Sequence, residues 1–121
     1  MGHDTLAART ADPETDYGLT AADYEAFQQA DIQLAEFLGD PSFRGGLYRD
    51  LIFHATSVSL YQVWMPSSLV REMGAKLEAA DASAIAAKLQ RPPEDVEREM
   101  RELARFFRLC VERDLGLVNS W

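Results

Sequence analysis

The sequence is poor in the residues that carry redox and metal chemistry. It contains one cysteine, Cys110, and two histidines, His3 and His54. A single cysteine excludes an internal disulfide, and because Cys110 lies on an apolar helical stripe we expect a buried thiol rather than a nucleophile. No group of His and Cys residues has the spacing of a metal motif, and we expect His54, among apolar neighbours, to be a core residue. The sequence predicts neither a metal site nor a cofactor.

Long apolar runs and enzyme motifs are also missing. No apolar run approaches the roughly 20 residues that a membrane-spanning helix requires. The first residues lack the basic and apolar regions of a signal peptide, and Leu6 stands where a myristoylation signal requires Ser or Thr. Neither a phosphate-binding glycine loop nor a nucleophile elbow is found. We therefore expect a cytoplasmic, non-enzymatic protein without a membrane partner.

Positive charge is scarce and unevenly distributed. The chain has 12 Lys and Arg residues against 20 Asp and Glu residues, a net charge of −8. Residues 1–50 contain only three basic side chains, Arg9, Arg44 and Arg49, whereas residues 84–121 contain as many basic as acidic residues. This asymmetry predicts an acidic surface that meets a basic partner or repels nucleic acid, or that serves solubility alone.

The length and composition indicate one folded domain. A chain of 121 residues suffices for a single core, and 47% hydrophobic with 26% charged residues is typical of a soluble globular protein. Residues 1–19 are small, polar and acidic and offer little to bury, which predicts a flexible N-terminal arm. We expect residues 20–121 to form a single helical domain.

Apolar residues recur at helical spacing through most of this domain. Thr20, with Asp23 three residues later, predicts the start of a helix that Gly39 ends. Residues 47–64 are ambiguous: a buried helix is the preferred prediction, and a strand or short hairpin is the alternative because their second half is rich in β-branched and aromatic residues. Pro66 opens the next helix.

Two further helices are predicted in the C-terminal part. Asp81 caps a short helix over residues 82–90. A pair of prolines ending at Pro93 separates it from the last and longest helix, residues 93–115, because Pro disfavours helical geometry in the preceding residue and is tolerated at the first helical position. Gly116 is well placed to stop that helix in a left-handed turn.

Small and apolar residues flank this break at set offsets, at Ala86, Leu89, Val96, Met100 and Leu103. In this spacing they resemble the helix-turn-helix of winged-helix and related bacterial or phage regulators. The resemblance implies that helix 93–115 is a recognition helix whose first residues face the major groove. Here those residues are acidic, Gln90 replaces the usual turn glycine, and the chain ends before a wing. These departures favour a motif that packs or binds a partner protein over one that reads DNA. The resemblance spans Leu77 to Gly116.

A second resemblance, over Pro66 to Trp121, is to the tail of a family of small uncharacterised bacterial proteins. It rests on two helices, the pair Phe106-Phe107 and a closing Gly-Leu-Val, and it implies an α+β fold without a known activity. From the periodicity we predict a mainly α fold, a compact bundle of about five helices with a helix-turn-helix-like C-terminal half. The alternative is α+β with a short hairpin at residues 47–64.

The last helix also carries the predicted binding surface. Its arginines lie on one face opposite the apolar stripe, and two large apolar residues fall towards the same side. Because arginine and aromatic residues are enriched in interface cores, this composition predicts a partner-binding surface. This arginine face comprises Arg98, Arg101, Arg105, Phe106, Arg108 and Leu109.

Alternative interpretations of the arginine face are a solvated surface, or a face covered within the monomer. In the second, helix 21–38 packs on Phe106 and Leu109, and its acids Asp23 and Glu36 neutralise the arginines. The preferred function is a non-enzymatic module that binds another protein, including a second copy of itself, as an adaptor, immunity or small regulatory protein. The alternative is a DNA-binding regulator whose arginines contact phosphate.

Overall fold

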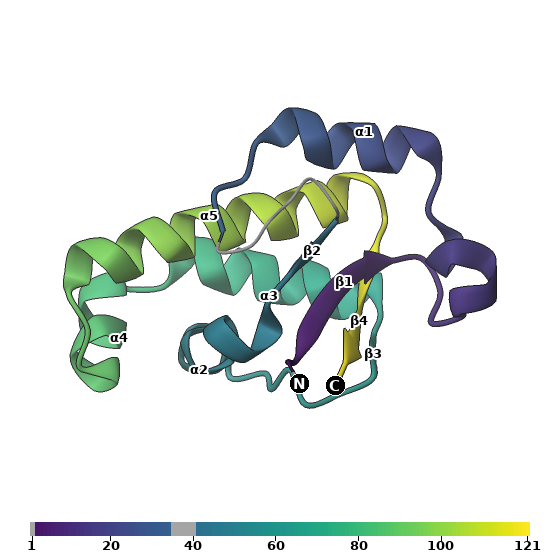
Figure 1. The fold of residues 1–121 in the computed structure, drawn as a ribbon. Coiled ribbons are helices and arrows are strands. Elements are labelled where there is room, and N and C mark those ends of the chain that lie inside the picture. The colour runs from purple at the N-terminus through teal and green to yellow at the C-terminus, as the bar shows by residue number, and fades with distance from the viewer. Residues whose placement is uncertain (1, 35–40) are drawn as a thin grey trace.

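The computed structural model describes residues 2–34 and 41–121 of the chain. Over these residues it contains five α-helices, a 3₁₀ segment and four short strands (Figure 1), which confirms the mainly α prediction. None of the helices in these two ranges is both long and apolar enough to span a membrane. The helical elements are η1 (Pro13–Gly18), α1 (Ala21–Ala30), α2 (Gly45–Thr56), α3 (Ser67–Ala79), α4 (Ala82–Leu89) and α5 (Pro93–Glu112).

The four strands form one antiparallel sheet in the order β2-β1-β4-β3. Its two central strands come from opposite ends of the chain, with Thr5 opposite Asn119. The two chain ends therefore lie side by side at the bottom of Figure 1. The strands are β1 (Asp4–Ala8), β2 (Ser42–Phe43), β3 (Trp64–Met65) and β4 (Gly116–Ser120).

β1 replaces part of the flexible arm predicted for residues 1–19. The alternating residues His3, Thr5 and Ala7 are all buried, as expected for one face of a strand. These side chains are small or polar, so the buried face lacks the large apolar residues that indicate a strand in sequence. The residue that pairs with Thr5 is Asn119, which lies 114 residues further along the chain. The structure thus corrects the prediction by making residues 4–8 a central strand.

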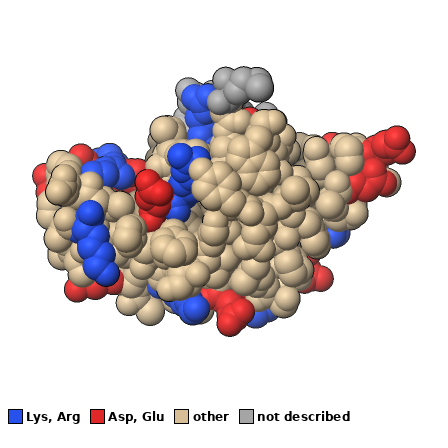
Figure 2. Space-filling model, turned by 90° about the horizontal axis from the view of Figure 1, so that it is seen from below, with Lys and Arg blue, Asp and Glu red and all other residues tan. Residues whose placement is uncertain are grey.

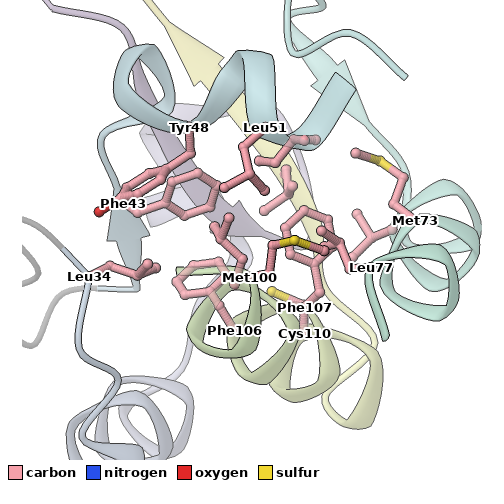
Figure 3. Close-up of a cluster of buried hydrophobic side chains, with 14 of the residues drawn as sticks. Leu34, Phe43, Tyr48, Leu51, Met73, Leu77, Met100, Phe106, Phe107 and Cys110 are labelled. Atoms are coloured by element: carbon pink, nitrogen blue, oxygen red, sulfur yellow. The ribbon is translucent and has the colours of Figure 1, made fainter. Parts of the chain in front are cut away.

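The core lies where α2, α3 and α5 meet beside the sheet (Figure 3). α5 packs along α3 and α4, and α3 also contacts β4. The predicted apolar stripe of α5 is confirmed, since all its members are buried and removed from water. That stripe is Val96, Met100, Leu103, Phe107 and Cys110.

Local capping signals place several helix ends where the sequence predicts them. Thr20 and Asp23 form a capping box at the start of α1, in which each side chain accepts a hydrogen bond from the other residue's backbone N–H. The Asp81 side chain accepts from two backbone N–H groups of α4. Gln90 ends α4 in the left-handed conformation at φ 56°, and Pro93 opens α5.

Residues 47–64 form neither the continuous helix nor the hairpin considered from the sequence. α2 ends at Thr56, whose hydroxyl donates to the Ile52 carbonyl and accepts from the Val58 N–H. Ser57 then adopts a left-handed conformation at φ 61° and turns the chain out of the helix. β3 follows at the end of this segment. It pairs with β4 and not with another part of residues 47–64, so the segment contains no hairpin.

Gly116 does not end α5 as predicted. The left-handed position is Asp114, at φ 55°, and the Leu115 N–H closes the helix end by donating to the Cys110 carbonyl at 2.8 Å. Gly116 instead begins β4, where a Cβ atom would lie 2.3 Å from the Met65 carbonyl oxygen. Glycine at this position therefore permits the close approach of β3 to β4.

α1 is shorter than the helix predicted over residues 21–38. It ends at Ala30 because Asp31 adopts a left-handed conformation at φ 50°. The predicted terminator, Gly39, lies outside the described residues. α1 still supplies a core side chain, Phe27, which is fully buried.

Candidate functional site

The structure places part of the predicted arginine face in the core. Phe106 is fully buried, and its ring centroid lies 5.1 Å from that of Phe27 and 5.0 Å from that of Phe43. Leu109 is partly buried against the core. The cause is visible in Figure 1, where α1 lies over α5. Phe106 is therefore corrected from a surface residue to a core residue.

The four arginines of this face remain at the surface, and acids neutralise most of their charge. Arg101 is the exception, since it makes no ion pair with any residue in the described ranges. Asp23 pairs elsewhere, with Arg9 and Arg113, and Glu36 lies outside the described residues. The pairs on the arginine face are Arg98–Asp95 at 3.2 Å, Arg105–Glu102 at 2.7 Å and Arg108–Glu78 at 2.5 Å.

Three of these arginines are brought together along a groove between α3 and α5. The groove has a volume of about 410 Å³, an apolar floor that includes Leu77 and Met100, and acids as well as arginines on its rim. Arg98 lies apart, in a hollow with Gln33 and Arg91. Because both signs of charge line the groove, it favours no single class of ligand. Its arginines are Arg101, Arg105 and Arg108.

A different surface gathers large exposed apolar side chains, and sequence reasoning missed it. Its members come from α2, from the segment before β3 and from the residue after β4, and all are between 50% and 63% exposed. Figure 2 shows this underside as a broad uncharged area with charged side chains mainly towards one side and the margins. We call this surface the aromatic patch; Leu47, Tyr61 and Trp121 form it, since Leu47 and Trp121 line one pocket and Tyr61 stacks on Trp121. Phe53 and Val63 are the other exposed large apolar residues.

Stacked rings form the centre of the aromatic patch. The ring of His3 stacks on that of Trp121 with centroids 4.7 Å apart, and Tyr61 stacks on Trp121 at 6.0 Å with an interplanar angle of 8°. The Arg49 guanidinium lies 5.1 Å from the centroid of the Tyr61 ring, within the range of a cation–π interaction. These contacts hold half-exposed side chains in one arrangement before any partner binds.

A buried hydrogen-bond network fixes this stack to the sheet. The side-chain oxygen of Asn119, Oδ1, accepts from the Thr5 hydroxyl at 2.7 Å and lies 2.9 Å from His3 Nε2, which therefore carries the proton. Asn119 Nδ2 donates to the Gln62 carbonyl at 2.8 Å. The segment that carries Tyr61 is thus tied to both chain ends.

A pocket opens beside the stack at the start of α2. Its volume is about 480 Å³, and none of its lining residues in the described ranges is acidic. Two arginines contribute positive charge, and Leu47 with Trp121 contributes apolar walls. We call this hollow the α2 pocket; it is lined by Gly2, His3, Arg44, Gly46, Leu47, Arg49 and Trp121.

Gly45 lets the start of α2 approach β1 closely beside the α2 pocket. A Cβ atom on Gly45 would lie 2.3 Å from Thr5 Oγ1, so no side chain fits there. In sequence, the glycines at the start of α2 indicate only a weakened first helical turn.

Exposure of Leu47 or Trp121 carries no sequence signal, because large apolar residues are equally typical of a core. His54, predicted in the core, is exposed, since the buried face of α2 is formed by Leu51 and its helical neighbours.

Metal-binding and nucleophilic side chains are the other candidates for chemistry. Among the described residues, no group of three or more His, Cys, Asp or Glu side chains is placed to hold a metal ion. Cys110 is fully buried, and this burial raises the pKa of its thiol, which stays protonated at neutral pH.

Comparison with protein-family models, curated proteins and solved structures gives no match to this chain.

Proposed function

We propose that the chain is a protein-binding module that contacts its partner through the aromatic patch. The observation that carries the proposal is the contact among large apolar side chains that are each at least half exposed. Leu47 and Trp121 line one pocket, and Tyr61 stacks on Trp121. Leaving such area in water forgoes about 25 cal/mol per Å² that burial would provide. Contiguous exposed apolar surface is accordingly typical of interaction sites.

The chemistry of the patch supports a protein as the occupant. Tyr61, Trp121 and Arg49 belong to the residue types that contribute most of the binding energy at protein interfaces. The stack on His3 and the network through Asn119 already restrict these side chains. Binding would therefore cost little side-chain entropy, which favours affinity for a given contact area.

The alternative function, a helix-turn-helix DNA-binding regulator, has weaker support. α4, a short turn and α5 follow one another as that motif requires. The first turn of α5, however, carries Glu94 and Asp95, which DNA phosphates would repel. Three of the four arginines on its outer face are also engaged in ion pairs. A protein is therefore the partner to which the proposal commits.

Truncation of the patch tests this proposal. A photo-crosslinking amino acid at position 63 should capture one partner of discrete mass in the source cell. The double variant Tyr61→Ala, Trp121→Ala should abolish that capture, because both rings lie at the centre of the patch, while changing the thermal unfolding temperature little. The matched control is Arg101→Glu with Arg105→Glu, on the arginine face, which should leave capture unchanged.

Other outcomes would redirect or contradict the assignment. Capture that is lost in the Arg101 and Arg105 variant but kept in the Tyr61 and Trp121 variant would move the interface to the arginine face. Retention on heparin at low salt, with a steep salt dependence, would favour the DNA-binding alternative. Self-association by light scattering that the patch variant disrupts would identify the partner as a second copy of the chain.

A further inference from the structure

We infer that the α2 pocket binds a carboxylate of the partner protein, presented next to an apolar side chain. The inference rests on the proposed function, because it names the chemistry of the segment that lies on the aromatic patch. It is carried by the charge, the polar groups and the walls of the pocket.

The charge of the α2 pocket is opposite to that of the chain. The whole chain has a net charge of −8, yet no described acidic residue lines this pocket, and the positive charge on which the inference rests is that of Arg49. Arg49 makes no ion pair with any residue in the described ranges, and its guanidinium lies over the Tyr61 ring, 5.1 Å from the centroid. Its guanidinium donors are thus available to an incoming anion. On the arginine face, by contrast, an anion would have to compete with the acids that already pair with the arginines.

The start of α2 adds to this positive potential. The first backbone N–H groups of a helix lack intrahelical acceptors and carry a partial positive charge. No acidic residue lies in the first turn of α2, and no side chain caps it. Gly46 lines the pocket and has no side chain to cover the backbone. The Gly46 N–H already donates to the His3 carbonyl at 3.0 Å, so the helix end contributes its dipole and not a free donor. The hydrogen bonds to an anion would come from Arg49.

His3 provides a further polar group in the pocket wall. It is only 6% exposed, and its Nε2 is engaged with Asn119. Its other ring nitrogen, Nδ1, is buried and has no hydrogen-bond partner among the described residues. Because Nε2 carries the proton, Nδ1 is an acceptor and would repel a carboxylate oxygen. Buried polar atoms are usually satisfied, so Nδ1 calls for a donor such as a backbone N–H of the bound segment, and the carboxylate itself is held by Arg49.

The walls of the α2 pocket distinguish a carboxylate on a protein from a polyanion. Leu47 and Trp121 offer apolar surface directly beside the charged groups. An arginine fork matches a carboxylate with two parallel hydrogen bonds. A nucleic acid would bring many phosphates to a chain of net charge −8, which would repel most of them. An acidic side chain or a chain-terminal carboxylate beside an apolar residue fits both features.

Nuclear magnetic resonance of the full chain can test the inference, because its two tryptophans report separately. Trp121 lines the pocket, whereas Trp64 lies in β3 and serves as the internal control. The probes are acetyl-Gly-Glu-Leu-Gly-amide, the same peptide with Gln for Glu, and acetyl-Gly-Leu with a free carboxylate. The indole N–H signal of Trp121 should shift saturably with a carboxylate peptide, and the Gln peptide should bind about tenfold more weakly.

Variants then assign the effect to the pocket. Arg49→Gln should weaken binding of the carboxylate peptide about tenfold, which corresponds to one charge-assisted hydrogen bond. Arg71→Gln, at an exposed arginine of α3 outside the pocket, is the matched control and should have no effect. The Glu peptide and the peptide with the free carboxylate distinguish a side-chain source from a terminal one.

Three results would overturn the inference. They are equal affinity for the Glu and Gln peptides, equal affinity of the unmodified chain and Arg49→Gln, and tighter binding of inorganic phosphate than of either carboxylate peptide. Each can occur while Tyr61→Ala with Trp121→Ala still abolishes partner capture, in which case the proposed function stands and only the carboxylate is excluded. If the variant Tyr61→Ala with Trp121→Ala still captured the partner, the proposed function itself would be contradicted.

Discussion

At the scale of single residues, Asp23 connects three parts of the chain. Its carboxylate is fully buried and pairs with Arg9 near the end of β1 and with Arg113 at the end of α5. It also accepts from the Thr20 N–H at the start of α1. The Arg9 guanidinium, with Thr20 and Arg113, holds the pKa of this carboxyl well below its usual range despite burial.

This lowered pKa gives a prediction for stability against pH. Asp23 contributes stability above its unfolded-state pKa of about 3.9, and the contribution is lost as pH falls from there towards the lower folded-state pKa. Asp23→Ala should therefore lower the free energy of unfolding, measured in urea, by on the order of 3 kcal/mol at neutral pH. The difference between variant and unmodified chain should shrink at acidic pH.

The matched control is Asp95→Ala, which removes the exposed pair with Arg98. Exposed ion pairs contribute at most about 1 kcal/mol, so this variant should lose little. A loss for Asp23→Ala no larger than that of Asp95→Ala would show that the buried carboxylate does not hold these three elements together.

At the scale of elements, adjacent glycines at the start of α2 have opposite requirements. A Cβ atom on Gly45 would meet Thr5 Oγ1 at 2.3 Å and His3 Nε2 at 2.9 Å, whereas one on Gly46 would lie 3.6 Å from its nearest neighbour, His3 Cβ. Gly45→Ala should destabilise by about 1–3 kcal/mol through overpacking. Gly46→Ala should be neutral or stabilise by up to about 1 kcal/mol. Equal unfolding temperatures for both variants would contradict this close approach.

The elements that could be predicted from sequence are those specified by neighbouring residues. The cap at Asp81, the left-handed Gln90 and the proline at the start of α5 act within one helical turn, so α4 and α5 lie where expected. β1 could not be predicted, because it pairs with β4 at the other end of the chain. The strand considered within residues 47–64 forms only at their end, where β3 pairs with β4. Phe106 shows the same limit, since only α1, packed over α5, makes its side of the helix a buried one.

The candidate site depends on tertiary structure even more than the strands do. Leu47, Tyr61 and Trp121 come from three separate segments, and each could equally have been a core residue by composition. What exposes them is the path of the chain after Thr56 and the pairing of the two chain ends. The arginine face, by contrast, followed from helical spacing alone, and that spacing gave no information about its ion-pair partners.

At the scale of the whole molecule, the pairing of β1 with β4 connects the fold to the aromatic patch. The Ala7 N–H donates to the Pro41 carbonyl at 2.8 Å, and β1 is paired on its other side with β4. Amide protons in residues 5–8 should therefore exchange with solvent about as slowly as those in the middle of α5, because both open only with the core. Residues 12–16, which are exposed, provide the fast-exchanging internal control.

The variant Asn119→Ala extends this prediction to the patch. It removes the acceptor shared by Thr5 and His3 and the donor to the Gln62 carbonyl, which leaves buried polar groups unpaired. Exchange in residues 5–8 should become faster, and the emission of Trp121 should change because its stacking partner His3 is released. Exchange in residues 5–8 as fast as in residues 12–16 in the unmodified chain would instead mean that the N-terminal segment is a flexible arm. A pre-formed aromatic patch would then be excluded together with the strand, since His3 holds Trp121 only while β1 is paired.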